Sequence, residues 1–555
     1  MGISGGHDAV VIGSGAGGAA AAWRLCAHGL RVLVLEAGPA FDPARDYPQD
    51  RPGWELRGFP ERPGSRAVVS YGDLGQLDPA DADLGSWSRA GFPWRLPAGA
   101  PRPPSGRGYS HVLGVGGSTL HFVGEQHRLH PDAFRLFSLT GKGADWPIAY
   151  DDLEPYYTIA EEMQLVAGAG AAPGRWRSRG FAQSAHPLGP GARAVVAAGR
   201  RLGQDWQVNP RATLSAPDAG RPACNYCGQC ARGCPLGDKG SVEVTFLRVA
   251  AATGRLDLVS DATVTRLHAG PDGRITHLDA IVDGQGESIE TPLVVLAAGA
   301  VQTPRLLLLS ADADHPQGIA NSSGEVGRNF METLSWQTTG LVAGLSGSHL
   351  GLPDDAICWD MAAPGRVPGH AGGFVLKHTT VETGLNGPIA YATRLVAGFG
   401  ASLKTALRAR FGSALSVGAV GQLIPDEQAR VGLDPGLRDA HGLPAARIES
   451  VLTAESRALL REMAGAVRTL LAEAGAEPVE ETGSRDAFAA PHVLGTARMG
   501  GDAGRSVVGP DARAHDHPNL WIADASIFPT SGAVNRRASR SWRWPSAPPM
   551  RSPAT

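Results

Sequence analysis

The glycines between positions 13 and 18 have the spacing of a loop that binds a pyrophosphate. Gly13, Gly15 and Gly18 form a Gly-x-Gly-x-x-Gly pattern. The first glycine permits a tight turn, the second lets the backbone approach the pyrophosphate, and the third lets a helix pack closely on a strand. Glu36 follows Gly18 by 18 positions, where an acid can bind the ribose hydroxyls. The pattern therefore predicts a dinucleotide site.

The elements on either side of this loop fit that prediction. Residues 9–12 and 31–35 are continuous apolar runs, which are typical of strands buried in a parallel sheet. The alanine-rich stretch 19–28 favours a helix, whose N-terminus offers free N–H groups and a positive dipole end to a pyrophosphate. After Glu36 no third strand follows directly, and residues 41–104 are irregular and rich in Pro, Arg and Asp. This interruption favours FAD over a nicotinamide dinucleotide.

Segments later in the chain supply further parts of such a domain. Residues 114–122 form a second Gly-rich loop with small hydroxyls, which suits close contact of the backbone with a ring or a phosphate. Residues 293–300 and 519–526 are apolar strands, and the second of them carries Asp524 near its end. We expect the flavin domain to be completed by these returning segments.

His492 begins a His-x-x-Gly-Thr pattern that suits proton transfer. Oxidation of an alcohol removes a proton from the hydroxyl and a hydride from the carbon, and a flavin accepts the hydride at N5. A neutral imidazole, with a pKa near ~6.5, can accept the proton at neutral pH. A single histidine among the 17 in the chain is most often structural. The Gly-Thr pair at 495–496 favours a base that is held on a rigid turn.

Together these motifs resemble the glucose–methanol–choline (GMC) oxidoreductases, a family of FAD enzymes. The resemblance covers residues 7–535 and rests on motifs in the family's order: the N-terminal fingerprint, GGSTL, AAGAVQTPRLLLLS, GRN, HxxGT and NLWIADASIFPTSGAVN. Residues 340–420, which shape the substrate pocket in this family, match only weakly. The resemblance implies these FAD contacts: Gly13, Gly15, Gly18, Glu36, Gly117, Ser118, Val264, Asp524 and Ala525. It also implies His492 as catalytic base and Asn535 as the partner that hydrogen-bonds the same substrate hydroxyl.

A second histidine, His121, follows the second Gly-rich loop. In pyranose-oxidase-like members of the family, a histidine at this place is bonded covalently to the flavin, whereas many other members bind FAD without such a bond. The spacing from Gly117 to His121 is compatible with attachment. Both forms of FAD binding therefore stay open.

Four of the six cysteines lie close together. Their spacing is that of a bacterial ferredoxin, and thiolates on a Gly-rich loop suit a soft metal. The four are Cys224, Cys227, Cys230 and Cys234. Similar Cys-rich insertions occur in gluconate- and fructose-dehydrogenase-like relatives, where an iron–sulfur cluster relays electrons from flavin to a cytochrome. Zinc and disulfides are the competing interpretations.

The composition argues against several classes of partner. The chain has 51 basic and 54 acidic residues and a net charge of −3, which gives no electrostatic attraction to nucleic acid or an anionic membrane. No run approaches the ~20 apolar residues of a membrane span. The first residues lead into a strand without a basic segment or a cleavage site. We therefore expect a cytoplasmic protein, or a periplasmic one with an exporting partner subunit.

We expect an α/β fold with a Rossmann-like FAD domain built from discontinuous segments. An inserted α+β substrate domain should carry a mostly antiparallel sheet. The FAD domain is assigned to 1–40, 105–160, 221–340 and 490–535, and the substrate domain to 41–104, 161–220 and 341–489, with the Cys-rich loop at 224–235. Local patterns predict two strands within 256–267 separated at 261–264, a strand over 447–452, helices over 305–310 and 459–474, and a Pro-rich lid or connector over 93–104.

The chain departs from the family after Asn535. The family continues there with an apolar helix, whereas residues 536–555 are polar and rich in Arg and Pro, without a helical stripe. The abrupt change is typical of a shifted reading frame and predicts a disordered tail. The missing helix would direct its positive N-terminal end toward the flavin, so its loss is expected to lower activity.

Three functions follow from these patterns. The first is an FAD-dependent dehydrogenase for a sugar or polyol hydroxyl, which passes electrons to a partner subunit, a cytochrome or a quinone, through an iron–sulfur cluster where one is bound. The second is an FAD oxidase that passes electrons to oxygen. The third is a flavin-binding protein without redox turnover, either lyase-like or disabled by its tail.

Overall fold

A computed structural model describes residues 6–48, 59–60, 62–72, 79–88, 109, 111–170, 176–483 and 492–533. Three features named from the sequence lie outside these residues: the Pro-rich stretch 93–104, Asn535 and the tail 536–555. The remaining predicted elements and site residues are described.

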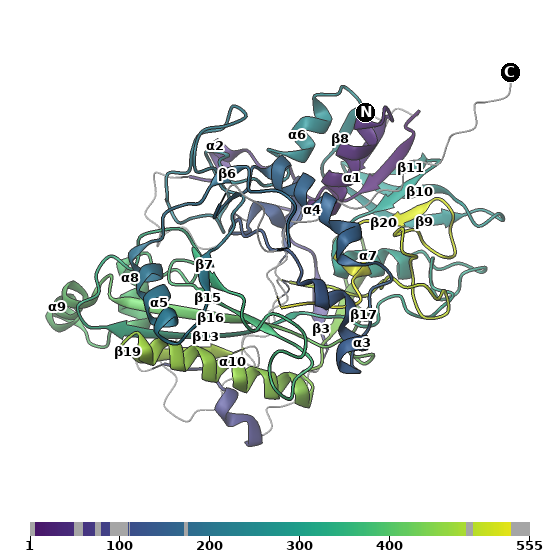
Figure 1. Cartoon of the computed structure of the whole chain (residues 1–555). Coiled ribbons are helices and arrows are strands. Elements are labelled where there is room, and N and C mark those ends of the chain that lie inside the picture. The colour runs from purple at the N-terminus through teal and green to yellow at the C-terminus, as the bar shows by residue number, and fades with distance from the viewer. Residues whose placement is uncertain are drawn as a thin grey trace.

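A five-stranded parallel sheet forms the core of the domain at the upper right of Figure 1. Its strand order is β20-β12-β1-β2-β8, and every pair is parallel. The strands are β1 (Ala9–Ile12), β2 (Val32–Leu35), β8 (Leu256–Val259), β12 (Val294–Leu296) and β20 (Leu520–Ile522). Strands from the beginning, the middle and the end of the chain thus lie side by side. This confirms the predicted Rossmann-like domain of discontinuous segments.

Helix α1 (Ala16–Ala27) follows β1 and packs on this sheet. Its alanines are small and buried, and α6 (Phe246–Ala251) covers it on the outside. The helix ends where Gly29 adopts a φ of 90°, a conformation that favours glycine. The local pattern therefore predicted the first strand–helix–strand unit correctly.

An antiparallel three-stranded sheet flanks the parallel sheet. It consists of β9 (Ala262–Ala269), β10 (Ile275–Val282) and β11 (Gln285–Glu290). The prediction of two strands within 256–267 was correct in number, but the separation at 261–264 was wrong, because β9 already begins at Ala262. Residues 262–264 pair with β10, a contact that the local pattern does not contain.

Helix α7 (Gly299–Leu309) begins earlier than predicted and contains Pro304 in its interior. A proline there has no N–H and leaves the carbonyl four residues earlier without its helical partner. In this helix that carbonyl belongs to Ala300, and the hydroxyl of Thr496 donates to it over 2.8 Å. This donor comes from a segment far along the chain. The local pattern does not contain it and therefore predicted that the helix starts at the proline.

A seven-stranded sheet at the lower left of Figure 1 forms the second domain. Its order is β4-β19-β13-β16-β15-β14-β7, and all pairs are antiparallel, as predicted. The strands are β4 (Trp87–Ser88), β7 (Trp206–Val208), β13 (Thr333–Val342), β14 (Ala356–Cys358), β15 (Phe374–His378), β16 (Ala414–Gln422) and β19 (Ala476–Gly483). Because β13 begins at Thr333, this sheet starts ahead of the boundary at 340 assigned from the sequence.

Helix α10 (Ala454–Glu473) lies along one face of this sheet together with α5 (Pro190–Arg201). It starts five residues before the predicted stretch, because the side chain of Thr453 accepts a hydrogen bond from the Ser456 N–H at its N-terminus. Its apolar side chains are buried at helical spacing, as predicted: Leu459, Leu460, Met463, Val467, Leu470 and Leu471.

Shorter elements connect the two domains. A further sheet combines β17 (Arg430–Arg438), β18 (Pro444–Glu449) and β3 (Val69–Tyr71), and a two-stranded one combines β5 (Ala167–Gly168) and β6 (Gln183–Ser184). The strand predicted over 447–452 is β18, which pairs with β17 and β3 rather than with the seven-stranded sheet. The other helices are α2 (Pro43–Asp46), α3 (Leu136–Thr140), α4 (Tyr150–Gln164), α8 (Pro388–Ala390) and α9 (Gly400–Arg410), with short turns at η1 (Pro79–Leu84), η2 (Gly117–Leu120), η3 (Pro131–Arg135), η4 (Tyr391–Leu395) and η5 (Ala525–Ile527).

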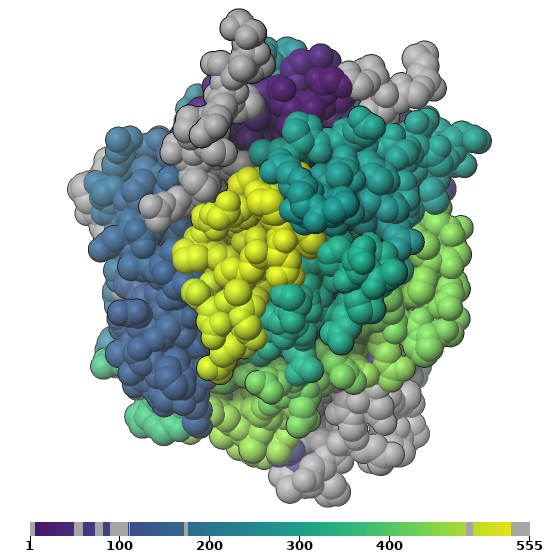
Figure 2. Space-filling model, turned by 90° about the vertical axis from the view of Figure 1, so that its right-hand side faces the viewer, coloured from purple at the N-terminus to yellow at the C-terminus, as the bar shows by residue number. Residues whose placement is uncertain are grey.

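The C-terminal described segment, residues 492–533, lies against segments from the first third and the middle of the chain. Figure 2 shows it in yellow between a blue and a teal region. Within the described residues, no helix combines the length and the apolar character needed to cross a membrane.

The packing of α10 predicts the outcome of two substitutions. Leu460→Ala should lower the free energy of unfolding by about 2–5 kcal/mol, since it leaves a cavity between α10 and the seven-stranded sheet. Glu462→Ala, on the exposed side of the same helix, should change it by no more than about 0.5 kcal/mol. Urea unfolding followed by tryptophan fluorescence measures both, and equal effects would contradict this packing.

Candidate active site

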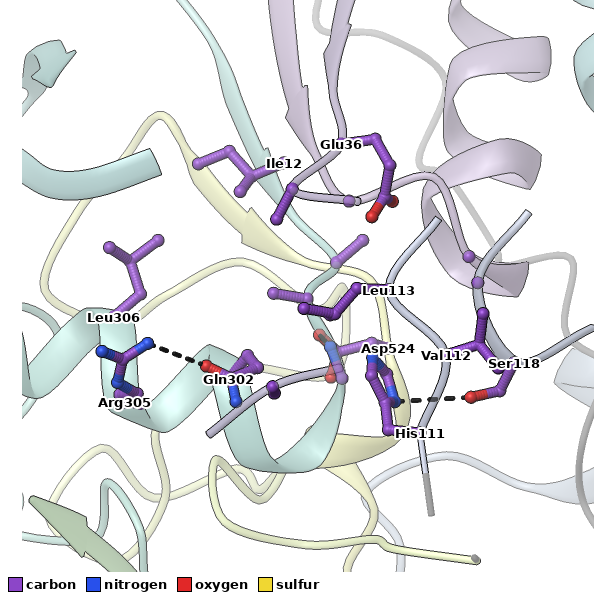
Figure 3. A pocket seen from close by; sticks show the side chains of 18 of the residues that line it. Ile12, Glu36, His111, Val112, Leu113, Ser118, Gln302, Arg305, Leu306 and Asp524 are labelled. Atoms are coloured by element: carbon purple, nitrogen blue, oxygen red, sulfur yellow. Dashed lines mark hydrogen bonds between the residues drawn. The ribbon is translucent and has the colours of Figure 1, made fainter. Parts of the chain in front are cut away.

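A cavity of about 340 Å³ opens at the carboxyl ends of β1, β2, β12 and β20. Parallel sheets in α/β proteins bind their ligands at this edge. Residues at the ends of the four strands line the cavity, including Gly13, Glu36, Ala298 and Asp524. Figure 3 shows that side chains from several distant segments surround it. The sheet therefore places the loop that was predicted to bind a dinucleotide at the wall of a cavity.

The N-terminus of α1 faces this cavity with its backbone donors available. Gly15 is the N-cap, no described side chain caps the helix, and its first turn contains no acid. Gly15 and Ala16 line the cavity. Such an N-terminus combines free N–H groups with the positive end of the helix dipole, which suits a pyrophosphate.

Glycines let the α1 N-terminus come this close to the strands. Gly13 has a φ of 96° in the turn. A Cβ added to Gly18 would lie 1.9 Å from the Gly13 carbonyl oxygen, and a Cβ added to Gly17 would lie 1.6 Å from the carbonyl oxygen of Ala523. The roles predicted for Gly13 and Gly18 agree with this packing. Gly17 was missed, because the fingerprint leaves its position open and β20 comes from the other end of the chain.

Glu36 connects the first Gly-rich loop to the second. One carboxylate oxygen accepts the N–H and the hydroxyl of Ser14 at 2.9 and 2.6 Å. The other accepts the N–H groups of Gly38 and Gly114 at 3.0 and 3.1 Å. Burial raises the pKa of this carboxyl, and the four donors oppose that shift. Glu36 lines the cavity, as its predicted ribose contact requires, and it also holds both loops in place.

The second Gly-rich loop touches the first. A Cβ on Gly117 would lie 2.9 Å from the Gly15 Cα atom, and Gly117 and Ser118 both line the cavity. The hydroxyl of Ser118 lies 3.4 Å from Nδ1 of His111, a residue that the sequence analysis did not single out. Burial lowers the pKa of His111 to about 4, so its ring is neutral at neutral pH. The available sequence signal for His111 was its position three residues before the second Gly-rich loop.

Asp524 holds the start of α7 at the edge of the cavity. Its Oδ2 accepts the Gly299 N–H at 2.9 Å and the Thr303 hydroxyl at 2.5 Å, while Oδ1 accepts the Ser526 N–H at 2.8 Å. Burial raises the pKa of the Asp524 carboxyl. Asp524 and Ala525 line the cavity, and the FAD contacts implied for them stay a prediction. The carboxylate also places negative charge at the N-terminus of α7, where the dipole stabilises it.

Val264 lines an apolar part of the same cavity together with Leu306 and Leu443. Beside it, Arg305 forms an ion pair with Asp439 at 2.6 Å and so joins α7 to the turn between β17 and β18. An apolar wall of this kind suits the flat face of an adenine. Its position agrees with the contact implied for Val264.

His492 lines the cavity, and a hydrogen bond to a residue outside the cavity lining orients its ring. Its Nδ1 lies 2.8 Å from the hydroxyl of Thr333, at the start of β13. Two residues later, Leu494 and Met331 exchange backbone hydrogen bonds of 2.9 Å. His492 therefore stands on a backbone segment that is paired with the entry to the second domain, as expected for a rigidly held base.

Glu332, next to Thr333, is a buried acid that the sequence analysis missed. Its side chain is 2% exposed, and burial raises its pKa to about 8. The buried phenol of Tyr71 lies within its electrostatic reach. At neutral pH the folded protein thus contains a protonated carboxyl one residue from the partner of His492.

His121 lies on the other side of the second loop. It follows η2, and its ring packs 6.2 Å from the ring of Phe59. The described residues that line the cavity include Gly117 and Ser118 but not His121. The structure therefore brings His121 near the loop without bringing it to the cavity wall.

The four cysteines of the Cys-rich loop are free thiols in the described part of the chain. Burial raises the pKa values of the Cys224 and Cys227 thiols, and that of Cys234 reaches about 12. The Cys234 thiol donates to Asp238 over 2.8 Å. Within the described part of the chain, no three ligand atoms of this loop lie within 4.8 Å of one another, as the ligands of a single metal ion would. A cluster of several irons needs thiolates that are farther apart than the ligands of one ion.

Lys239 attaches the Cys-rich loop to the cavity wall. Its side chain is fully buried, and its ammonium group donates to the carbonyl oxygens of Leu120, Phe122 and Cys230 at 2.7, 3.0 and 2.8 Å. Leu120 ends η2, which begins at the cavity residue Gly117. One cation therefore joins the second Gly-rich loop to the cysteines.

The chain matches two parts of a family described as GMC oxidoreductase, over residues 143–334 and 425–539. A family described as NAD(P)-binding Rossmann-like domain matches residues 11–41. The first pair of matches includes Val264 and His492, and the last includes the first Gly-rich loop and Glu36.

Curated relatives match over nearly the whole chain. The 2-methyl-1,2-propanediol dehydrogenase of Mycolicibacterium austroafricanum is 30% identical, with 95% of this chain and 92% of that protein covered. The fructose dehydrogenase large subunit of Gluconobacter japonicus is 29% identical, with 95% and 94% covered. The crystal structure of pyridoxine 4-oxidase from Mesorbium loti has the same fold, with a TM-score of 0.60, 19% identity, and 95% of this chain and 96% of that chain covered.

Gly17→Ala tests the contact between α1 and β20. The added Cβ would meet the Ala523 carbonyl, so the α1 N-terminus must move and FAD retention should weaken at least about tenfold, or ~1.4 kcal/mol. The flavin-to-protein absorbance ratio after purification measures this. Gly465→Ala, on an open face of α10 with no atom within 4 Å of the added Cβ, is the matched control and should retain FAD fully.

Glu332 predicts a pH dependence of stability. Because its pKa is raised to about 8 in the folded protein, the unfolded chain loses this proton first as pH rises. Its contribution is present below the ordinary pKa of a glutamate and is lost between about pH 4.5 and 8, at up to ~1.4 kcal/mol per pKa unit. Glu332→Gln should remove this decline. Urea unfolding at pH 5, 6.5 and 8 checks it, and parallel curves for the two proteins would contradict the assignment.

Proposed function

The chain belongs to the GMC oxidoreductase family, as its motifs predicted, and we propose that it is an FAD-dependent dehydrogenase that oxidises a hydroxyl of a sugar or polyol with His492 as base. Family members bind FAD and act on CH–OH donors. The observation that carries the proposal is the meeting of the α1 N-terminus, the second Gly-rich loop and His492 at one cavity.

The described residues fit FAD. The uncapped N-terminus of α1 suits the pyrophosphate, Glu36 the ribose, and the apolar wall at Val264 the adenine. Gly117 and Ser118 lie on the same cavity as His492, where the flavin ring would be held between them. Bound there, FAD supplies a hydride acceptor for the substrate carbon.

His492 supplies the proton acceptor. The substrate O–H proton would move to the imidazole of His492, and FAD held in the cavity would supply the acceptor for the hydride released from the C–H bond, so that the alcohol would become a carbonyl. With Nδ1 oriented by the Thr333 hydroxyl, we assign Nε2 as the base. Thr333 is thus a positioning residue that sets the ring angle. Asn535, outside the described residues, is the proposed second contact to the substrate hydroxyl.

The names of two relatives support a polyhydroxylated substrate. One denotes a dehydrogenase of a propanediol and the other the large subunit of a fructose dehydrogenase. Both substrates carry vicinal or multiple hydroxyls that a polar site can recognise. The second name also supports a partner subunit that takes up the electrons.

We propose that the Cys-rich loop holds an iron–sulfur cluster, which would supply one-electron transfer to that partner. Four free thiols with ferredoxin spacing lie on one loop, and this donor set suits iron–sulfur chemistry. Lys239 places a buried positive charge beside it, which favours thiolate over thiol. Its contacts to Leu120 and Phe122 keep the loop next to the wall where FAD would bind.

Two substitutions separate the base from its positioning residue. His492→Ala should retain FAD but lose anaerobic bleaching of the flavin by substrate, with a rate at least about 100-fold lower. Thr333→Val should lower kcat less, by about tenfold, and shift the pH profile of kcat/KM, while Thr333→Ser should restore both. Rapid-mixing absorbance at 450 nm with a panel of sugars and polyols measures this. Rapid bleaching in His492→Ala would exclude it as the base.

The electron acceptor is tested on the purified enzyme. Iron and acid-labile sulfide analysis with electron paramagnetic resonance should show a cluster that disappears in Cys227→Ser, while FAD content and substrate bleaching persist. Oxygen consumption without a cluster signal would instead assign an oxidase. Tightly bound flavin that no alcohol bleaches would assign a protein without redox turnover.

A further inference from the structure

Two histidines and an aspartate gather on one face of the β9–β11 sheet, at the right of Figure 1. One side-chain ligand atom from each of His268, His277 and Asp279 lies within 4.8 Å of the other two. We call these three residues the histidine cluster. It lies outside the cavity, and neither the cofactor nor the proposed reaction uses it.

Strand pairing brings the cluster together. His268 on β9 is directly opposite His277 on β10, and Asp279 is two residues further along β10 on the same face. The two imidazole rings stack with centroids 4.2 Å apart and planes 5° apart, so binding of one ion in the plane of both rings requires one ring to rotate out of this stack. The opposite face carries Leu267 and Leu278, which are buried. The rigid apolar packing below the sheet therefore fixes the backbone of all three residues.

Hydrogen bonds engage all three side chains. Asp279 Oδ2 lies 2.7 Å from Nε2 of His268, and the Thr276 hydroxyl lies 3.0 Å from Nδ1 of His277. Because Nδ1 of His277 is engaged by Thr276, Nε2 is the nitrogen that remains for a metal. A partner on the second nitrogen is the usual way in which a ligating histidine is held.

We propose that the histidine cluster binds a divalent transition-metal ion of the Zn²⁺ class. Two imidazoles and a carboxylate are a ligand set that Zn²⁺ accepts, with a fourth position for water or another oxygen. The side chains of His268 and Asp279 are 29% and 42% exposed, so the ion can enter from solvent. The three candidate ligands come from two neighbouring strands.

The surroundings leave room for a cation. Arg266 pairs with Asp279 across the strands, but its guanidinium donates to the carbonyl oxygen of Ala311 on the chain that follows α7. On the other side of β10, Glu290 of β11 is directly opposite His277 and is exposed. Its carboxylate is therefore a candidate for the fourth position. The ion would then clamp all three strands.

Such a clamp would act on the cofactor domain, because β9 contributes Ala262, Thr263 and Val264 to the cavity wall. A metal that binds only the folded sheet stabilises it by mass action. The expected role is structural: the ion fixes β9 and β10 against each other behind the apolar wall. It does not depend on the identity of the substrate or on the electron acceptor.

Zn²⁺ titration of the chelator-treated, tag-free holoenzyme tests the proposal. Isothermal calorimetry should show a Zn²⁺ site that His277→Ala and Asp279→Asn each weaken about tenfold or more. Cys227→Ser distinguishes Zn²⁺ bound by the Cys-rich loop from Zn²⁺ bound by the histidine cluster. This variant should still bind Zn²⁺ at the histidine cluster. Co²⁺ as a visible probe should give a spectrum without thiolate charge-transfer bands in that variant.

The matched control is His315→Ala. His315 also lies beside a carboxylate, with Nδ1 3.0 Å from Asp312, but belongs to no described three-ligand group. This variant should bind Zn²⁺ as the unmodified enzyme does. The proposal is wrong if Cys227→Ser binds no Zn²⁺, if the two cluster variants bind it unchanged, or if His315→Ala weakens binding as much as they do.

Discussion

The contact between the first turn of α1 and the strands beside it is the constraint on which the cavity depends. Nothing larger than hydrogen fits at Gly17 or Gly18, where the backbone carbonyl oxygens of Ala523, directly after β20, and of Gly13 in the first loop occupy the space of a Cβ. The helix therefore begins directly at the carboxyl edge of the sheet, and its free N–H groups face the place of a pyrophosphate. Glu36 then holds the second loop against the first. The other parts of the site are positioned relative to this junction of the α1 N-terminus with the two Gly-rich loops.

The proposed proton acceptor, His492, is positioned by a different set of long-range contacts. Pro304 leaves a carbonyl of α7 without its helical partner, and Thr496 fills that vacancy. Leu494 pairs with Met331, ahead of β13. The segment that carries His492 is thus attached both to the cofactor domain and to the first strand of the second domain.

Lys239 anchors the Cys-rich loop, which carries the proposed electron path, in a comparable way. A fully buried ammonium group is costly unless its donors are satisfied, and here three backbone carbonyls accept from it. Those carbonyls belong to the cavity-side loop and to the Cys-rich loop. The proposed cluster would therefore sit at a fixed position relative to FAD. The same cation offsets part of the negative charge that thiolates bring.

The sequence by itself determined the first strand–helix–strand unit, the glycines and acid of its fingerprint, the family, the antiparallel character of the second sheet and the apolar face of α10. The first unit, its fingerprint and the face of α10 follow from local spacing, since periodicity and turn residues act within a few positions, whereas the family and the antiparallel sheet were expected from the whole set of motifs. Tertiary structure alone decided the strand order, in which β12 lies between β1 and β20, that α7 extends through Pro304, that His111 lines the cavity whereas His121 does not, and that β13 belongs to the second sheet. It also decided the importance of Gly17 and the cluster of His268, His277 and Asp279. The physical reason is that these features depend on partners hundreds of residues away or on the neighbouring strand, and a pattern along the chain does not record which strand lies beside which.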